Sequence, residues 1–132
     1  MLGTFQQSNL RIEVDASEQR IRHSLLQPAQ FRQWLYPQTF SVGLEECLQK
    51  STTFTSWMGP IPILHQVEMA ELNGLRILMS KGIDGYHEWY WGEGWVQSRI
   101  AGVSILPINL GQTLSLVRLR TFLTLPEKFP LN

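Results

Sequence analysis

Residues 61–100, IPILHQVEMAELNGLRILMSKGIDGYHEWYWGEGWVQSRI, contain three dipeptides typical of tight turns, set among segments rich in β-branched and aromatic side chains. They are Asn73-Gly74, Asp84-Gly85 and Glu93-Gly94. A two-residue turn at each dipeptide predicts an antiparallel meander. At the last turn a three-residue loop over 92–94 with a bulge is an alternative, and it would slip the final strand by one residue.

The predicted register places opposite charges on adjacent strands, which stabilises such pairs. The charged pairs are Glu71 with Arg76, Lys81 with Glu88, and Glu88 with Arg99. The same register places Met69 opposite Leu78, Val67 opposite Ser80, and Trp91 opposite Val96. We therefore expect all three hairpins to be in register with their turn dipeptides.

Alternation along these strands separates a polar face from an apolar face. The predicted polar face carries Gln66, Glu68, Lys81, Glu88, Gln97 and Arg99, with Ala70, Ile77, Met79 and Tyr90 between them. The predicted apolar face carries Ile63, His65, Val67, Met69, Leu78, Ser80, His87, Trp89, Trp91, Val96, Ser98 and Ile100. The second face has the composition of a core or a pocket wall.

The adjacent pair His87-Glu88 invites comparison with a catalytic acid and base. Neighbours on a strand point to opposite faces, so we expect Glu88 to face solvent and His87 to lie beside Trp89 and Trp91. His65 is predicted on the same face as His87, two strands and ~9.5 Å away. No carboxylate accompanies them there, so no metal site is expected. The two histidines either bond to water or backbone, or orient a ligand in an apolar pocket.

Other catalytic signatures are absent from the sequence. There is no G-x-S-x-G motif, no phosphate-binding glycine loop, and no reason in the sequence for Ser56 or Ser104 to meet either histidine. Cys47 is the only cysteine, which excludes an internal disulfide, and it is expected to be a buried inert thiol. We predict no catalytic residue, no metal and no cofactor.

The flanking segments are predicted to contain three helices and two further strands, one of them in STTFTSWM (51–58). NLRIEVD (9–15) alternates as a half-buried strand, and Asp15 and Glu18 have the spacing of a capping box for a following helix. Pro28 is expected to begin a second helix that ends before Pro37, whereas residues 38–50 suit either a helical turn or a strand. The segment from about Asn109 to Leu125 indicates a broad-faced helix, with a strand as the alternative.

Length and charge limit the function classes. With 132 residues the chain is expected to form a single domain, residues 1–132. Eleven basic and eleven acidic side chains balance, which disfavours general nucleic-acid binding. No signal peptide or apolar span is visible, so no integral membrane segment is expected and a cytoplasmic location is predicted.

This order of elements resembles the START-like helix-grip superfamily, also called SRPBCC. IEVDASEQRIRHSLLQPAQFRQWLYP resembles the first part of that family, and GVSILPINLGQTLSLVRLRTFL occupies the place of its long helix. FTSWMGPIPILHQVE and DGYHEWYWGEGWVQSR are similar to segments of small uncharacterised cyanobacterial members. The resemblance implies an α+β helix-grip fold, in which a strongly curved antiparallel sheet wraps the C-terminal helix around a cavity for lipids, polyketides or other apolar molecules. Some members are cyclases, dehydratases or hydrolases, but the superfamily shares no catalytic motif.

We therefore expect the chain to bind a small lipophilic or aromatic molecule between sheet and helix. The predicted cavity residues are His65, Val67, Met69, Leu78, His87, Trp89, Trp91, Ser98 and Leu114. One alternative is a cyclase or dehydratase that uses His65 or His87 as proton carrier. Another is an interaction protein or homodimer joined through Ile77, Met79 and Tyr90 on the polar face.

Overall fold

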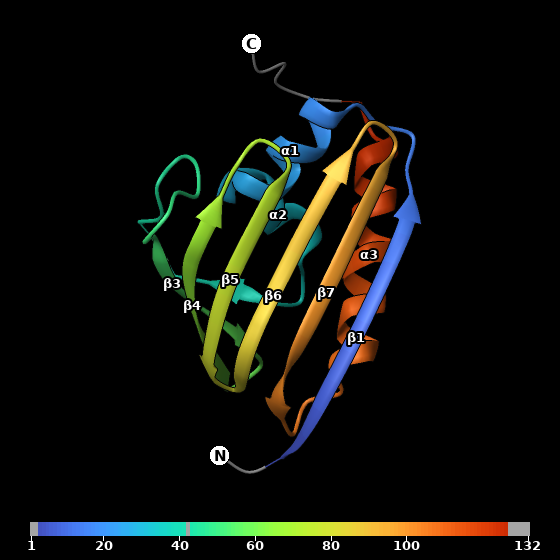
Figure 1. The fold of residues 1–132 in the computed structure, drawn as a ribbon. Coiled ribbons are helices and arrows are strands. Elements are labelled where there is room, and N and C mark those ends of the chain that lie inside the picture. Colours follow the sequence, from blue (N-terminus) through green and yellow to red (C-terminus); the bar gives the residue numbers. More distant parts are fainter. Residues whose placement is uncertain (1–2, 42, 127–132) are drawn as a thin grey trace.

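The computed structural model describes residues 3–41 and 43–126 and shows a seven-stranded antiparallel sheet with three helices (Figure 1). The strands follow the order β1-β7-β6-β5-β4-β3-β2 across the sheet. The elements are β1 (Thr4–Glu13), α1 (Glu18–Leu26), α2 (Pro28–Trp34), β2 (Thr39–Phe40), β3 (Thr53–Met58), β4 (Ile61–Ala70), β5 (Gly74–Lys81), β6 (Ile83–Gly92), β7 (Trp95–Ser104) and α3 (Ile108–Thr124). This is the predicted α+β helix-grip arrangement.

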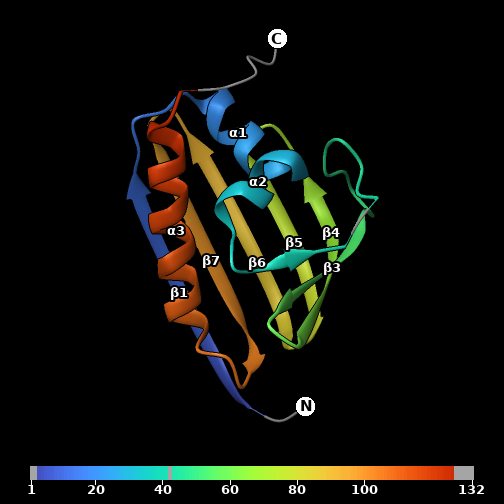
Figure 2. The same ribbon diagram turned by 180° about the vertical axis from the view of Figure 1, so that it is seen from behind.

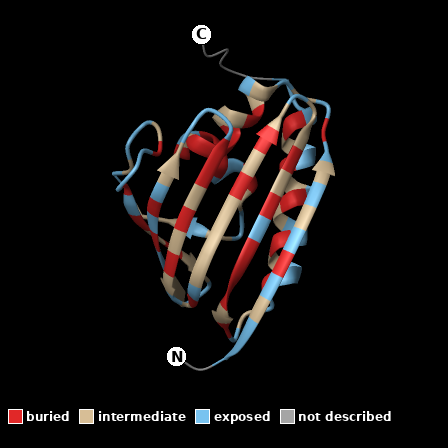
Figure 3. Cartoon of the chain, in the orientation of Figure 1, coloured by how far each residue is buried: buried red, intermediate tan, exposed pale blue. Residues whose placement is uncertain are grey.

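All three helices lie on one face of the curved sheet. Seen from behind, α3 runs along β1 and β7, while α1 and α2 cover one end of the central strands (Figure 2). The core fills the space between these layers and includes Trp34, Trp91 and Leu119. Buried residues alternate with intermediate and exposed ones along much of the strands, because successive side chains point to opposite faces of the sheet (Figure 3). One face of the sheet is therefore available to enclose a pocket.

The helix ends match the sequence prediction in part. Ser17, rather than Asp15, is the N-cap of α1, and its hydroxyl accepts a hydrogen bond from the backbone N–H of Arg20 at 3.1 Å. The predicted capping box is therefore wrong by two residues. Pro28 begins α2 as expected, because its fixed φ suits the first helical turn. The C-terminal segment is helical, not extended. Residues 38–41 and 43–50 form the short β2 and otherwise irregular structure.

The last hairpin has the predicted register. Gly92 pairs with Trp95 across a two-residue turn in which Gly94 has φ +75°, a conformation that favours glycine. Glu88 is consequently opposite Arg99, and Trp91 is opposite Val96. The alternative three-residue loop is not formed.

The first hairpin differs from the prediction. Ala70 pairs with Leu75, so the turn is centred on Leu72 and Asn73, one residue before the predicted dipeptide. The N–H of Glu71 donates to the carbonyl of Gly74 at 2.8 Å and closes this turn. A bulge between Val67 and Met69 shifts the register again, a feature that bends a strand.

The second hairpin also differs, because its reversal lies at Lys81 and Gly82. Met79 pairs with Gly85, which places the predicted turn residues Asp84 and Gly85 inside β6. Gly85 is opposite Gly102 of β7, and a Cβ on Gly85 would lie 1.9 Å from the carbonyl oxygen of Ala101. The glycine therefore allows a close approach of two strands rather than a turn.

These shifts reverse the predicted faces of β5. Ile77 and Met79 are buried in the core, which corrects their assignment to the polar face. Leu78 and Ser80 alternate with them and point away from the core. The bulge has a similar effect on Met69, whose methyl group lies near Gly74 and the Tyr90 ring on the outer face.

Glu88 lies on the outer face, as predicted, but with a different partner. Arg76 binds Glu68 at 2.6 Å and Glu88 at 2.9 Å, and the Tyr90 hydroxyl donates to Glu88 at 2.9 Å. The expected Lys81–Glu88 pair is replaced because the second hairpin is shifted. Pairs of this partly exposed kind contribute little stability, about 1 kcal/mol or less each.

Candidate ligand-binding pocket

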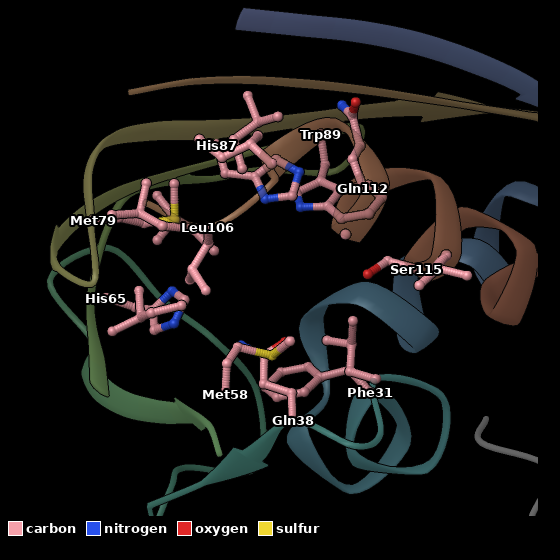
Figure 4. A pocket seen from close by; sticks show the side chains of 18 of the residues that line it. Phe31, Gln38, Met58, His65, Met79, His87, Trp89, Leu106, Gln112 and Ser115 are labelled. Atoms are coloured by element: carbon pink, nitrogen blue, oxygen red, sulfur yellow. The ribbon is translucent and has the colours of Figure 1, made fainter. Parts of the chain in front are cut away.

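A pocket of about 350 Å³ lies between the covered face of the sheet, α2 and α3 (Figure 4). This volume is within the range of about 300–1,000 Å³ that small-molecule sites occupy. The wall is mainly apolar, and no Asp or Glu side chain among the described residues lines it. The pocket therefore suits an apolar molecule rather than a cation.

Strand alternation and helical periodicity supply the lining. Inward positions of β4, β5, β6 and β7 contribute Ile63, His65, Leu75, Ile77, Met79, Ile83, His87, Trp89 and Ile100. Helix α3 contributes Gly111, Ser115 and Arg118, which are three or four residues apart and share one helix face. A Cβ on Gly111 would meet no atom within 4 Å, so this part of the helix borders open space.

Four of the nine predicted cavity residues line this pocket: His65, His87, Trp89 and Leu114. Val67, Trp91 and Ser98 are buried but do not line it. Met69 and Leu78 lie outside the pocket, because the bulge and the shifted hairpins turn their side chains away from the core. On β6 the pocket thus includes the predicted His87 and Trp89 but not Trp91, and on β5 it includes none of the predicted residues.

His87 is held between a ring and a hydroxyl group. Its imidazole stacks on Trp89 with ring centroids 4.6 Å apart, and its Nε2 lies 2.7 Å from Ser98 Oγ. The Gln112 side-chain amide donates to Ser98 Oγ at 2.9 Å and to the Ser98 carbonyl at 3.0 Å. A third contact joins it to the Ser8 carbonyl at 3.4 Å. Elements β1, β6, β7 and α3 together therefore orient this histidine.

His65 has a similar environment on β4. Its ring stacks on Phe54 at 4.5 Å, and its Nε2 lies 2.8 Å from Ser56 Oγ. The Gln38 amide donates to the same hydroxyl at 2.7 Å. The expectation that Ser56 would not meet a histidine was wrong, because Ser56 pairs with Ile63 on the adjacent strand and lies next to the His65 position. The other serine, Ser104, instead donates to the Gly82 carbonyl.

Burial lowers the pKa of both histidines. The pKa of His65 is lowered to about 4 by burial. The pKa of His87 is lowered to about 3, mainly by burial and further by the neighbouring His65. A buried imidazolium loses its hydration, so the neutral ring is favoured in each case. At neutral pH the pocket offers two uncharged imidazoles.

The structure also adds polar residues that were not predicted at the site: Gln38, Ser56 and Gln112 beside the histidines, and Ser115 and Arg118 on α3. A signal for Gln112 was present, since the buried stripe of α3 runs through Ile108, Gln112, Leu116, Leu119 and Leu123. A polar side chain inside such a stripe needs a buried hydrogen-bond partner. Gln38 and Ser56 gave no comparable signal, because they meet only through the pairing of β2, β3 and β4.

Arg118 lines the pocket, and its guanidinium lies 4.7 Å from the centroid of the exposed Tyr36 ring. Over residues 3–41 and 43–126, no group of three His, Cys, Asp or Glu side chains could hold a metal ion. None of the helices in the same ranges is both long enough and apolar enough to cross a membrane.

No protein-family model and no curated protein matches the sequence. Solved structures do match the fold. Protein CV1439 from Chromobacterium violaceum superposes with a TM-score of 0.73 at 16% identity, covering 92% of this chain and 99% of that protein. DynU16, from the dynemicin biosynthetic locus, gives 0.68 at 14% identity over 89% of this chain and 47% of its own. The Aha1 dimer from Colwellia psychrerythraea gives 0.62 at 13% identity over 89% and 96%. At these identities the similarity establishes the fold alone.

Proposed function

We propose that this protein binds a small lipophilic or aromatic molecule in the pocket between the sheet and helices α2 and α3. The observation that carries the proposal is the apolar pocket of about 350 Å³, whose polar groups on the sheet side are two neutral histidines. Removing apolar surface from water would drive binding at about 25 cal/mol per Å². The resemblance to the START-like superfamily supports the same function.

The similarity to DynU16 gives limited further support. That protein is from the dynemicin biosynthetic locus and shares this fold. The proposal for this chain rests on its own lining residues, because the fold does not determine function.

The alternatives are less well supported by the geometry. A cyclase or dehydratase would need a histidine that exchanges protons near neutral pH, whereas the pKa values of His65 and His87 are lowered to about 4 and about 3. A homodimer through the predicted outer patch would need Ile77 and Met79 at the surface, and both are buried. Ligand binding without a committed reaction therefore remains the function we propose.

Substitution of Gly111 tests the pocket. A leucine there would extend from α3 into the open space beside Ser115, whereas an alanine adds only a methyl group. We expect Gly111→Leu to weaken binding of the neutral fluorescent probe N-phenyl-1-naphthylamine at least about tenfold, which corresponds to about 1.4 kcal/mol. Titration of probe fluorescence measures the effect, and Gly111→Ala is the matched control that keeps binding.

The same pair separates loss of the pocket from loss of the fold. Replacing a glycine inside a helix by alanine stabilises by about 0.5–1 kcal/mol, so Gly111→Ala should unfold at higher urea concentration than the parent. Equal probe affinities for Gly111→Leu and Gly111→Ala, with both proteins folded by circular dichroism, would contradict binding at this site.

A further inference from the structure

Both pocket histidines end a chain of hydrogen bonds with the same composition. In each chain a glutamine amide donates to a serine hydroxyl, and the hydroxyl contacts Nε2 of the imidazole. One chain runs Gln112–Ser98–His87 and the other runs Gln38–Ser56–His65. The two chains use different strands and different glutamines. The same pattern therefore occurs twice in the pocket wall, without a shared local sequence motif.

The direction of the hydrogen bonds is determined at His87. The Gln112 amide nitrogen contacts the carbonyls of Ser98 and Ser8, which can only accept, so this nitrogen also donates to Ser98 Oγ. Among the described contacts of the Ser98 hydroxyl, His87 Nε2 is the one acceptor available for its proton. Nε2 therefore accepts, and the proton of the neutral ring resides on Nδ1. At His65 the Gln38 amide nitrogen donates to Ser56 Oγ and His65 Nε2 contacts the same hydroxyl, so we infer the same direction there. The carbonyl contacts that orient the Gln112 amide have no counterpart among the described contacts of Gln38.

Each Nδ1–H is then a donor without a protein partner among the described residues. Both rings line the pocket. Neither Nδ1 is among the fully enclosed polar side-chain atoms that lack a partner, which are Trp91 Nε1 and, at the pocket wall, Gln112 Oε1. Met79 of β5 pairs with His65 on one side and with Gly85 of β6 on the other. His65 is therefore level with Gly85, which is two residues from His87. The two backbones are thus ~9.5 Å apart across the sheet and ~6.6 Å along it. Figure 4 shows both side chains at the border of the same open space.

We propose that the ligand is an uncharged molecule with an apolar skeleton and oxygen acceptors, of the carbonyl type, that receive N–H bonds from Nδ1 of His65 and His87. This inference rests on the proposed function and names the chemical class of its ligand. A hydrocarbon leaves both donors unbonded in a dry pocket, which costs free energy. A cation would face the two N–H donors and no carboxylate among the lining residues, so the pocket disfavours it.

A matched pair of small molecules tests the inference. α-Tetralone and tetralin have the same bicyclic skeleton and differ by one carbonyl oxygen. We expect α-tetralone to bind the unmodified protein about fivefold more tightly, since a net hydrogen bond contributes about 1 kcal/mol. Titrations followed by ¹H–¹⁵N correlation spectra give both dissociation constants. In the double variant His65→Phe/His87→Phe the preference should fall to about onefold.

Tautomer measurement provides a second test that needs no variant. Long-range ¹H–¹⁵N spectra of the imidazole rings at pH 7 distinguish a proton on Nδ1 from one on Nε2. We expect Nδ1–H for His65 and His87, with the Nδ1 resonances shifting when α-tetralone binds. A proton on Nε2 of both rings would overturn the inference.

The outcomes separate the two proposals. Equal affinity for α-tetralone and tetralin, with both displacing N-phenyl-1-naphthylamine, would overturn the recognition of acceptors and leave the pocket as a binding site. Failure of all three molecules to bind the folded protein would overturn the proposed function. Tighter binding of α-tetralone that is lost in the double variant supports both.

Discussion

Lowering the pH from 7 to 5 is expected to reduce the free energy of unfolding by about 4 kcal/mol. His65 and His87 have pKa values lowered to about 4 and about 3 in the folded protein, against an ordinary value of 6.5. Between these values the unfolded chain binds protons that the folded chain does not. Stability is therefore fully present above about pH 6.5 and decreases as the pH falls toward the folded pKa values. Each histidine contributes about 2 kcal/mol over this interval.

Urea unfolding at half-unit pH intervals measures this slope. The double variant His65→Gln/His87→Gln is the control, because glutamine keeps a hydrogen-bonding group near Ser56 and Ser98 but does not titrate. Its free energy of unfolding should change much less between pH 7 and 5. A parent protein as stable at pH 5 as at pH 7 would show that the histidines are not enclosed as described.

Replacing Gly85 by alanine is expected to lower the free energy of unfolding by about 3 kcal/mol. The new Cβ would lie 1.9 Å from the Ala101 carbonyl oxygen and 2.5 Å from the Gly102 Cα, which are backbone atoms of β7. Backbone in a paired strand cannot move aside as a flexible side chain can, so β6 and β7 must separate locally. Gly111→Ala, placed where a Cβ meets nothing, is the matched glycine control.

Equilibrium unfolding of the two alanine variants at pH 7 gives the comparison. Gly85→Ala should unfold at clearly lower urea concentration than the parent, and Gly111→Ala at slightly higher concentration. A Gly85→Ala protein with the stability of the parent would show that β6 and β7 do not approach closely at this point.

Gly85 also explains why the sequence predicted only part of the sheet. Asp84-Gly85 is a strong turn signal, yet its glycine serves a close contact inside β6. A glycine that forms a turn and a glycine that lets two strands approach closely can have the same local sequence. Only the neighbouring strand distinguishes them. The last hairpin was predicted correctly because Gly94 does adopt the left-handed conformation of a turn. The order of the helices and the single curved sheet depended on longer patterns and were predicted correctly.

The candidate site was predicted where alternation alone was sufficient. His87 and Trp89 share a face whatever the register of the hairpins, and both line the pocket. Met69 and Leu78 were misplaced because a single-residue shift exchanges the two faces of a strand. The Ser56–His65 contact joins two strands, and the Gln38–Ser56 contact joins the short β2 region to β3. Such contacts depend on tertiary pairing that a sequence does not display locally.

The contact of Gln112 with Ser8 spans 104 positions and links the first strand to the last helix. Contacts so distant in sequence can form only once the chain has brought its two ends together. The hydrogen bonds that orient His87 are therefore complete only when α3 lies along β1 and β7. The same helix lines the pocket through Gly111, Ser115 and Arg118. We expect a chain shortened before α3 to lose both this part of the pocket wall and the orientation of His87.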